Sequence, residues 1–189
     1  MKNFTNHKFL FTKNRTNFKT LGFAIILMTV TAVSSNVQAQ ITTFPYQVGF
    51  EGGNTDFGGW TQPTTDDFDW SNNENGTGST NTGPTGANEG TRYLYTEASS
   101  PRQTGDIADL EQEFDLTQVS GSPELIFDYH MFFNGNTTDG RLDVDVSTDG
   151  GSTWTNEFTR LGEQNTSNGD PWNTATVDLS AYGSNSSVF

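Results

Sequence analysis

The amino-acid sequence predicts an all-β fold, an antiparallel β-sandwich, from residue 40 to residue 189. Short segments in this range alternate apolar and polar residues with a period of two, which gives each expected strand one apolar face. Stretches rich in Gly, Asn, Thr, Ser and Pro separate these segments, as turns separate strands. No run of ten or more residues after residue 39 has the periodicity of a helix.

The first 39 residues precede this domain and are predicted to be a signal peptide. A basic stretch ends at Lys19, and a 13-residue apolar run follows from Leu21 to Val33. A membrane-spanning helix needs about 20 apolar residues, so this run is too short to be one. Small and polar residues then lead to Ala39, after which we expect cleavage. The mature chain is therefore expected to be secreted or held at the cell surface, without a transmembrane segment; an uncleaved anchor is the alternative.

The expected strands share the two-residue alternation and are, in order, 44–50, 68–70, 93–95, 125–133, 142–147 and 177–179. In the segment 142–147, the apolar residues are expected to face the core and the polar residues the solvent (Leu142, Val144, Val146; Asp143, Asp145, Ser147). The turn-rich stretch 71–90 is expected to be a long loop within one domain, and a domain boundary is the alternative. Residues 187–189 resemble the start of a further strand, so the domain is expected to be incomplete at its C-terminus.

The charge distribution excludes several kinds of partner and site. Five of the nine basic residues lie in the first 20 positions, and from residue 40 onward four Arg residues stand against 23 acidic residues, a balance of 4 − 23 = −19. Such a charge, with no lysine, repels phosphate backbones and anionic lipids, so no nucleic-acid partner is expected. The absence of cysteine excludes disulfides, thiolate zinc sites and a cysteine nucleophile.

Three carboxylates provide the one credible catalytic arrangement. Glu111, Glu113 and Asp115 are two residues apart, so a strand would project them from one face. Jelly-roll glucanases carry Glu-x-Asp-x-x-Glu on such a strand, but the last position here is Gln118, which cannot donate a proton to a leaving group. The one histidine after residue 39, His130, lies near no Gly-x-Ser-x-Gly motif and is interpreted as an outward-facing side chain. We therefore expect no enzymatic activity.

The segment from Ser147 to Trp154 matches the Asp-box pattern Ser-x-Asp-x-Gly-x-Thr-Trp at every fixed position. The Ser147 and Asp149 side chains are expected to bond nearby backbone N–H groups. Gly150 and Gly151 are expected to adopt positive φ angles, with Trp154 packed beneath them. The pattern predicts a hairpin and does not indicate a reaction.

An ordered series of short motifs resembles the MAM domain family. The series covers residues 44–189, and its order makes it more specific than any single motif. The motifs are Phe50-Glu51, Trp60-Thr61-Gln62, Asp66 to Trp70, Thr82-Gly83-Pro84, Gly90 to Ala98, Leu125 to Met131, Trp172 and Val177 to Ser180. The resemblance implies a jelly-roll β-sandwich of the concanavalin A-like type. Cysteines of the animal family are replaced here by Val48, Gly58 and Glu124, and the first two would replace a short-range pair together.

The resemblance implies a non-catalytic extracellular recognition or adhesion module. The cysteine-free composition, rich in Asn, Thr and Gly, resembles bacterial members that are secreted or carried on the cell surface. The expected partner is an extracellular protein or a glycan. One alternative is an accessory domain of an exported hydrolase, a protease or glycosidase whose catalytic part lies outside this chain. Another is a lectin-like module in which Trp60, Trp154 and Trp172 stack on a sugar, although tryptophans packed inside the sandwich explain the same residues.

The resemblance also implies a bound cation, because some MAM domains hold calcium or sodium near the first strand and an Asp-rich turn. The matching positions are Glu51, Asp67 and Asp69. Asp66, Asp67 and Asp69 also crowd like charges together, with no lysine after residue 39 to neutralise them, and carboxylate oxygens suit Ca²⁺. We therefore expect calcium at Glu51, Asp67 and Asp69; a solvated acidic surface is the alternative.

Overall fold

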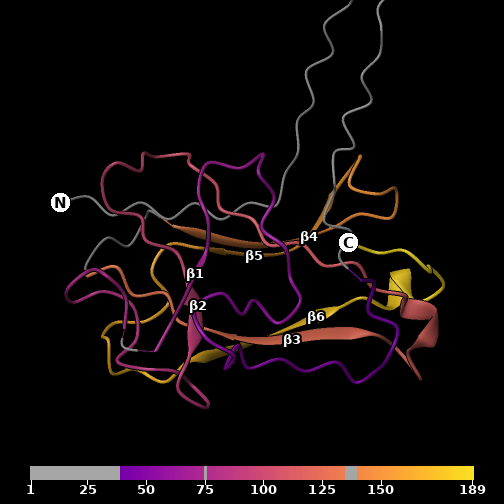
Figure 1. Cartoon of the computed structure of the whole chain (residues 1–189), viewed down its shortest axis with the longest axis horizontal. Coiled ribbons are helices and arrows are strands. Elements are labelled where there is room, and N and C mark those ends of the chain that lie inside the picture. The colour runs from indigo at the N-terminus through magenta and orange to yellow at the C-terminus, as the bar shows by residue number, and fades with distance from the viewer. Residues whose placement is uncertain (1–38, 75, 135–139) are drawn as a thin grey trace, which may run out of the picture.

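The structure, a computed structural model, describes residues 39–74, 76–134 and 140–189. The predicted signal peptide lies outside these residues except for Ala39. The described chain is built from short strands, two 3-10 helices and long loops (Figure 1). The strands are β1 (Ser71–Asn73), β2 (Tyr93–Tyr95), β3 (Glu124–Tyr129), β4 (Arg141–Val146), β5 (Thr155–Leu161) and β6 (Asn173–Asp178); the helices are η1 (Leu116–Gln118) and η2 (Ser180–Tyr182). The all-β prediction is confirmed, and no helix in the described residues is long and apolar enough to cross a membrane.

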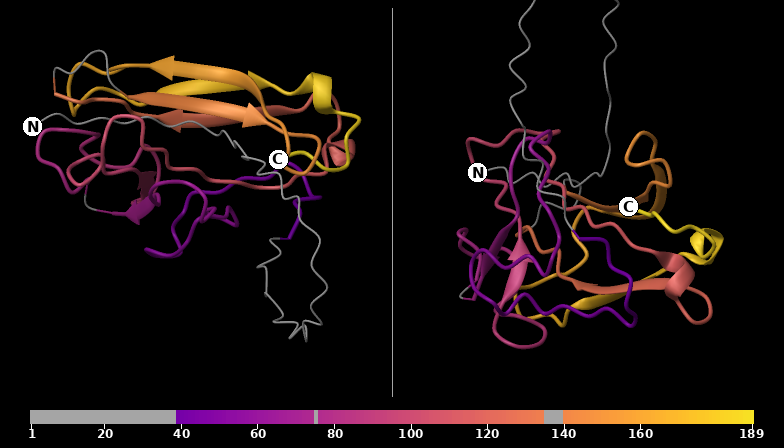
Figure 2. Two further views of the ribbon diagram at one scale, coloured as in Figure 1. Left: turned by 90° about the horizontal axis from the view of Figure 1, so that it is seen from above. Right: turned by 45° about the vertical axis from the view of Figure 1, so that its right-hand side comes forward.

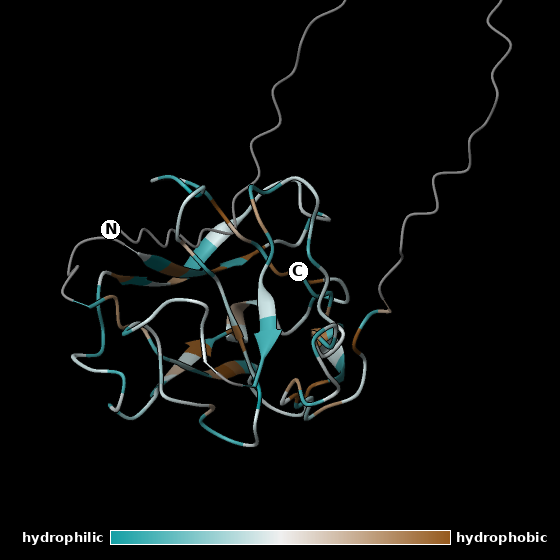
Figure 3. Ribbon diagram, turned by 60° about the vertical axis from the view of Figure 1, so that its left-hand side comes forward, coloured by the Kyte–Doolittle hydropathy of each residue, from teal (hydrophilic) through white to brown (hydrophobic). Residues whose placement is uncertain are grey.

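The strands pair antiparallel in three two-stranded sheets, β1–β2, β3–β6 and β4–β5. The β4–β5 hairpin lies between β3 and β6 in the sequence. In space the β4–β5 pair faces the β3–β6 pair, and β1–β2 lies towards one end of the molecule (Figures 1 and 2). Hydrophobic and hydrophilic residues alternate along several of the strands, while most loop residues are hydrophilic or intermediate (Figure 3).

The main core lies between the β3–β6 pair and the β4–β5 pair. Its buried members are Tyr129, Met131, Phe158, Ala175 and Val177. The Phe127 ring of β3 meets the Phe158 ring of β5 edge to face, with 5.5 Å between centroids. Ile126, on the opposite face of β3, is 60 % exposed. The alternation in the sequence therefore predicts the two faces of β3 correctly.

Backbone bridges extend the β4–β5 pair towards both ends of the described chain. Ser147, directly after β4, exchanges two backbone hydrogen bonds of 2.9 Å with Phe189. Val188 pairs antiparallel with Phe114, and Phe114 pairs parallel with Ile41. Val188 is 3 % exposed, so its side chain belongs to the core. The last residues of the chain thus take part in strand pairing, as their apolar pattern predicts.

The prediction for the polar face of β4 is wrong. The exposed fractions of its polar residues are 0 % for Asp143, 7 % for Asp145 and 1 % for Ser147. Thr159 Oγ1, on the paired strand β5, donates to Asp143 Oδ1 at 2.6 Å, and Arg141 Nε lies 2.5 Å from Asp143 Oδ2. Asn156 Nδ2 donates to Asp145 Oδ1 at 2.8 Å. Alternation distinguishes the two faces of a strand, but it does not reveal whether hydrogen-bond partners cover the polar face.

Several expected strand boundaries also differ. The segments 44–50 and 68–70 have the expected alternating burial but form no paired strand. The strand expected at 125–133 ends at Tyr129, because the backbone N–H of Met131 donates to the Asn165 side chain at 2.9 Å instead of to a neighbouring strand. The stretch 71–90, expected to be loop throughout, begins with β1.

Candidate functional site

Glu51, the first predicted calcium ligand, connects its loop by hydrogen bonds to the residues directly before β2. The carboxylate accepts hydrogen bonds from Thr91 N at 3.0 Å, Thr91 Oγ1 at 2.8 Å and Arg92 N at 3.0 Å. These hydrogen bonds lower the pKa of Glu51. Gly90 has a φ of +67°, and a Cβ atom there would lie 2.3 Å from Glu51 Oε1, so the carboxylate requires glycine at this position. Glu51 therefore has a structural role of its own.

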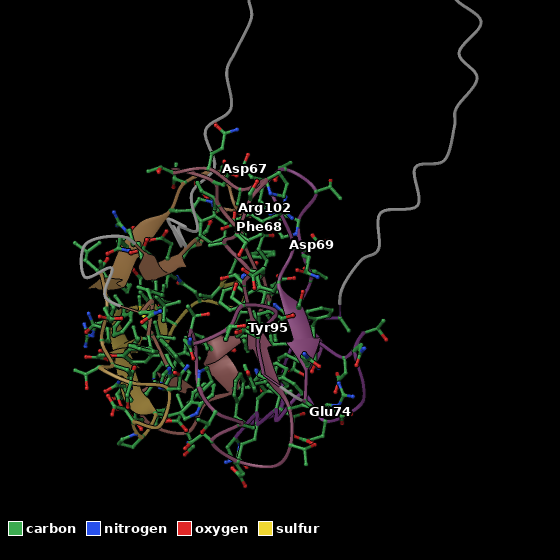
Figure 4. The ribbon with its side chains drawn as sticks, turned by 90° about the vertical axis from the view of Figure 1, so that its left-hand side faces the viewer. Asp67, Phe68, Asp69, Glu74, Tyr95 and Arg102 are labelled. Carbon is green, nitrogen blue, oxygen red and sulfur yellow. The ribbon has the colours of Figure 1, made fainter. Side chains whose placement is uncertain are left out.

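Asp67 and Asp69 lie at the surface on either side of Phe68 (Figure 4). Phe68 is 7 % exposed, and the Arg102 guanidinium lies 4.5 Å from the centroid of its ring. Asp67 Oδ2 accepts a hydrogen bond from the backbone N–H of Ile107 at 2.9 Å. The expected alternation, with the carboxylates outward and Phe68 inward, is present here without a paired strand.

The predicted calcium ligands contact different parts of the chain. Glu51 bonds to residues 91 and 92, whereas Asp67 bonds to residue 107. Within residues 39–74, 76–134 and 140–189, no group of three or more His, Asp or Glu side chains has an arrangement that could hold a metal ion. Calcium binding at Glu51, Asp67 and Asp69 therefore stays a prediction.

A buried group of carboxylates lies beside the Asp-rich loop. The backbone N–H of Asp109 donates to Asp66 Oδ2 at 2.8 Å. Asp109 is 3 % exposed, and its Oδ1 has no hydrogen-bond partner in the described part of the chain. Burial is the main cause that raises the pKa of Asp109 to about 8. Neighbouring carboxylates raise the pKa further, and they are Asp66, Glu111, Asp145 and Asp67. Asp109 is therefore mostly protonated at neutral pH.

Two carboxylates of the catalytic hypothesis hold the fold together. Glu113 Oε1 accepts hydrogen bonds from Gln40 Nε2 at 3.1 Å and from Ser187 Oγ at 2.6 Å, which links both ends of the described chain. Asp115 accepts a hydrogen bond from the backbone N–H of Thr117 at 3.1 Å and caps η1. These contacts favour a structural interpretation of the segment.

The interpretation of His130 as an outward-facing side chain is wrong. His130 is half-buried, with its ring centroid 6.0 Å from that of Trp172, and burial lowers its pKa. The reason is that β3 ends at Tyr129, so the alternation no longer determines the direction of the next side chain. Trp172 also meets the Tyr93 ring, with 5.5 Å between centroids. His130 and Trp172 therefore belong to one packed aromatic group.

The other two tryptophans of the lectin hypothesis also pack within the molecule. Trp60 meets the Phe114 ring edge to face, with 5.8 Å between centroids. Trp154 Nε1 donates to the carbonyl oxygen of Gly151 at 3.1 Å. Both contacts, together with the partial burial of the two residues, favour the packing alternative.

The Asp-box segment forms the turn between β4 and β5 as predicted. Gly151 N donates to Ser147 Oγ at 2.9 Å, and Thr153 N donates to Asp149 Oδ1 at 2.8 Å. Gly150 and Gly151 have φ angles of 68° and 78°. Hydrogen bonds from Thr153 and then Ser147 lower the pKa of Asp149 to about 2.

We expect Asp149→Ala to lower the Tm by several degrees, because the turn then loses its hydrogen-bond acceptor. The effect should be largest above pH 4 and disappear towards pH 2, because protonated Asp149 has already lost the charged acceptor. Thermal melts from pH 2 to pH 7 measure it, with Asp106→Ala as a control on an exposed loop. Equal effects at pH 2 and pH 7 contradict the prediction.

Val48 and Gly58, which occupy cysteine positions in the resemblance, are neighbours in space. A Cβ atom built on Gly58 would lie 2.9 Å from Val48 Cβ and 2.0 Å from Val48 Cγ2. Cβ atoms joined by a disulfide are about 3.5–4.5 Å apart, so the two positions are close enough for the pair that the family carries. The valine methyl group fills the space that a second side chain would need.

A cavity of about 340 Å³ opens beside β1 and β2. Its lining residues are Asn54, Phe57, Trp70, Ser71, Asn72, Asn73 and Tyr95. Tyr95 lies near the centre of the face shown in Figure 4. The sequence gives little sign of this cavity, because it forms only when Ser71 pairs with Tyr95 across a long turn-rich stretch. One residue of the cavity wall could be predicted from the sequence. Trp70 alternates with Asp69, and this alternation places Trp70 on the inner side of the segment.

Comparison with known proteins gives one family. The family model described as "MAM domain, meprin/A5/mu" matches residues 48–189. The matched range contains the six strands of the described residues and every residue that lines the cavity. No solved structure matches the chain.

Proposed function

Because the chain belongs to the MAM domain family, we propose that it is a non-catalytic extracellular recognition or adhesion module of a secreted or cell-surface bacterial protein. The observation that carries the proposal is the family match, which spans nearly all of the described chain. MAM domains are extracellular modules of the adhesion type, and they mediate protein interactions. The partner is an extracellular protein or glycan.

The fold supports the proposal in its finer form, a jelly-roll β-sandwich of the concanavalin A-like type over residues 40–189. Two strand pairs face each other across an apolar core. The bridges through Ile41, Phe114 and Val188 add further strand-like segments beside β4. A sandwich of this kind leaves long loops at its ends, where recognition sites commonly lie.

Binding to cells tests the proposal. We expect the fluorescently labelled full chain to bind the surface of bacteria saturably, and the unlabelled chain to compete for the same sites. Heat-unfolded chain is the control, because recognition depends on the folded surface. Binding that does not saturate contradicts a recognition role. Turnover of a β-glucan or peptide that disappears in Glu113→Gln contradicts the non-catalytic role.

We propose calcium binding at Glu51, Asp67 and Asp69 as part of this function. The family resemblance supports this proposal. The charge of the chain supports it too: from residue 40 onward, acidic residues outnumber basic ones, and this negative charge favours the binding of a divalent cation. Calcium should raise the Tm by mass action, and Asp67→Asn should remove most of that rise. Asp106→Asn is the matched control, because Asp106 also accepts one backbone hydrogen bond, from Gln103. Identical melts in calcium and in chelator contradict the proposal.

A further inference from the structure

We propose that the cavity beside β1 and β2 binds a neutral saccharide. The inference rests on the proposed recognition function and names the ligand class for one site. None of the seven residues that line the cavity carries a charge, although the chain from residue 40 onward has the balance 4 − 23 = −19. Such an uncharged, mostly polar surface within an acidic body suits a ligand that has many hydroxyl groups and no charge.

The size of the cavity suits a small ligand. Ligand pockets in proteins have volumes of about 300–1,000 Å³, and the cavity of about 340 Å³ lies at the lower end of this range. One sugar residue, or the end of a longer glycan, fits this space. The cavity is also open to solvent, so a glycan chain can continue outward from it.

The asparagine amides of the cavity are held in fixed orientations. Asn72 is 4 % exposed, and its Nδ2 donates to the carbonyl oxygens of Phe50 at 2.7 Å and Asp56 at 2.6 Å. Arg92 Nη1 donates to Asn54 Oδ1 at 2.8 Å and to Asn72 Oδ1 at 3.4 Å. The cavity wall is therefore pre-organised, which reduces the entropy lost when a ligand is bound.

Three groups on the wall remain available to a ligand. Asn54 uses its oxygen for Arg92, which leaves its Nδ2 donor without a partner in the described chain. The hydroxyl groups of Ser71 and Tyr95 likewise have no hydrogen-bond partner among the described residues. These donors and acceptors match the hydroxyl groups of a sugar, and the half-buried Trp70 and Tyr95 rings supply apolar surface for its C–H groups.

The binding experiment uses the full chain and four probes. The neutral probes are methyl α-glucoside, methyl β-galactoside and N-acetylglucosamine, and the anionic comparison is glucuronate. We expect at least one neutral probe to shift the amide NMR signals of Asn54 and Tyr95 saturably, with a dissociation constant on the order of 1 mM. Glucuronate should bind at least about tenfold more weakly, because the acidic body repels it.

Variants test whether binding occurs in this cavity. Asn54→Ala and Tyr95→Phe should each weaken binding by about threefold to tenfold, because each removes one hydrogen-bonding group. Asn88→Ala is the matched control: Asn88 is also exposed and also makes one side-chain hydrogen bond, to Asp128 at 2.6 Å. Far-ultraviolet circular dichroism and Tm confirm that each variant is folded.

The outcomes separate this inference from the proposed function. The inference is overturned if no neutral probe gives saturable shifts, if glucuronate binds more tightly, or if Asn88→Ala weakens binding as much as Asn54→Ala. If the chain binds cells but none of the neutral probes, the recognition function stands and the saccharide site does not. If the chain binds neither, both proposals fail.

Discussion

Gly58→Ala should lower the free energy of unfolding by about 3 kcal/mol or more, the largest effect that we expect from a single methyl group in this chain. Gly58 has a φ of +64°, which costs any L side chain about 1–2 kcal/mol. In addition, the new Cβ atom would lie 2.0 Å from Val48 Cγ2, a distance that forces the backbone or Val48 to move. Urea denaturation of the full chain measures the change.

Two further variants separate backbone strain from the contact with Val48. Gly150 has a similar φ of +68° with no atom within 4 Å of a built Cβ, so Gly150→Ala should cost only the backbone part. Val48→Ala combined with Gly58→Ala should recover part of the loss, because it removes both Cγ methyl groups. If Gly58→Ala and Gly150→Ala are equally destabilised, the contact with Val48 has no energetic role.

The free energy of unfolding should fall as the pH rises from about 4 to about 8, because Asp109 keeps its proton in the folded chain and loses it in the unfolded chain. The folded chain then binds more protons than the unfolded one, so the slope is negative at up to about 1.4 kcal/mol per pH unit. Relaxation around ionised Asp109 offsets part of this penalty, and we expect a total loss of about 2–4 kcal/mol. The lowered pKa values of Asp149 and Asp170, each about 2, act oppositely and remove stability only below about pH 4.

Asp109→Asn tests the assignment, because it keeps the shape of the side chain and removes its titration. The variant should be more stable than the parent chain at pH 8, and its stability should fall less between pH 5 and pH 8 than that of the parent chain. Asp178→Asn is the control: the pKa of Asp178 is lowered, so this substitution should leave the slope above pH 5 unchanged. A parent chain whose stability is constant from pH 5 to pH 8 would falsify the prediction.

The sequence predicts those parts of the fold that depend on local pattern. The alternation of Leu125, Phe127 and Tyr129 predicts the inward face of β3, and the Asp box predicts the turn before Trp154. Local pattern does not determine which strand lies opposite. The buried carboxylate Asp143 was therefore predicted to face solvent, since the partners that satisfy it are specified only when β4 and β5 pair.

The same limit applies to the candidate site. The short motifs predict the family and place Glu51 and Asp67 among its positions, but they do not show that Glu51 bonds to Thr91 and Arg92. The cavity depends on hydrogen bonds between segments about 20 residues or more apart, such as that from Arg92 to Asn54. Interactions of this kind leave no periodic signal in a single sequence.

The pairing around Phe114 also determines how the module responds to mechanical force. Ile41 runs parallel to Phe114 on one side, and Val188 runs antiparallel on the other, so the N-terminal and C-terminal directions of the chain leave this ladder at the same end. Tension applied at residues 41 and 188 therefore pulls both segments from the same end of the ladder. The hydrogen bonds to Phe114, and those between Phe189 and Ser147, are then loaded one after another. Bonds loaded in sequence yield at lower force than bonds sheared together. We therefore expect this ladder to open at a lower force than a ladder whose strands are sheared along their length.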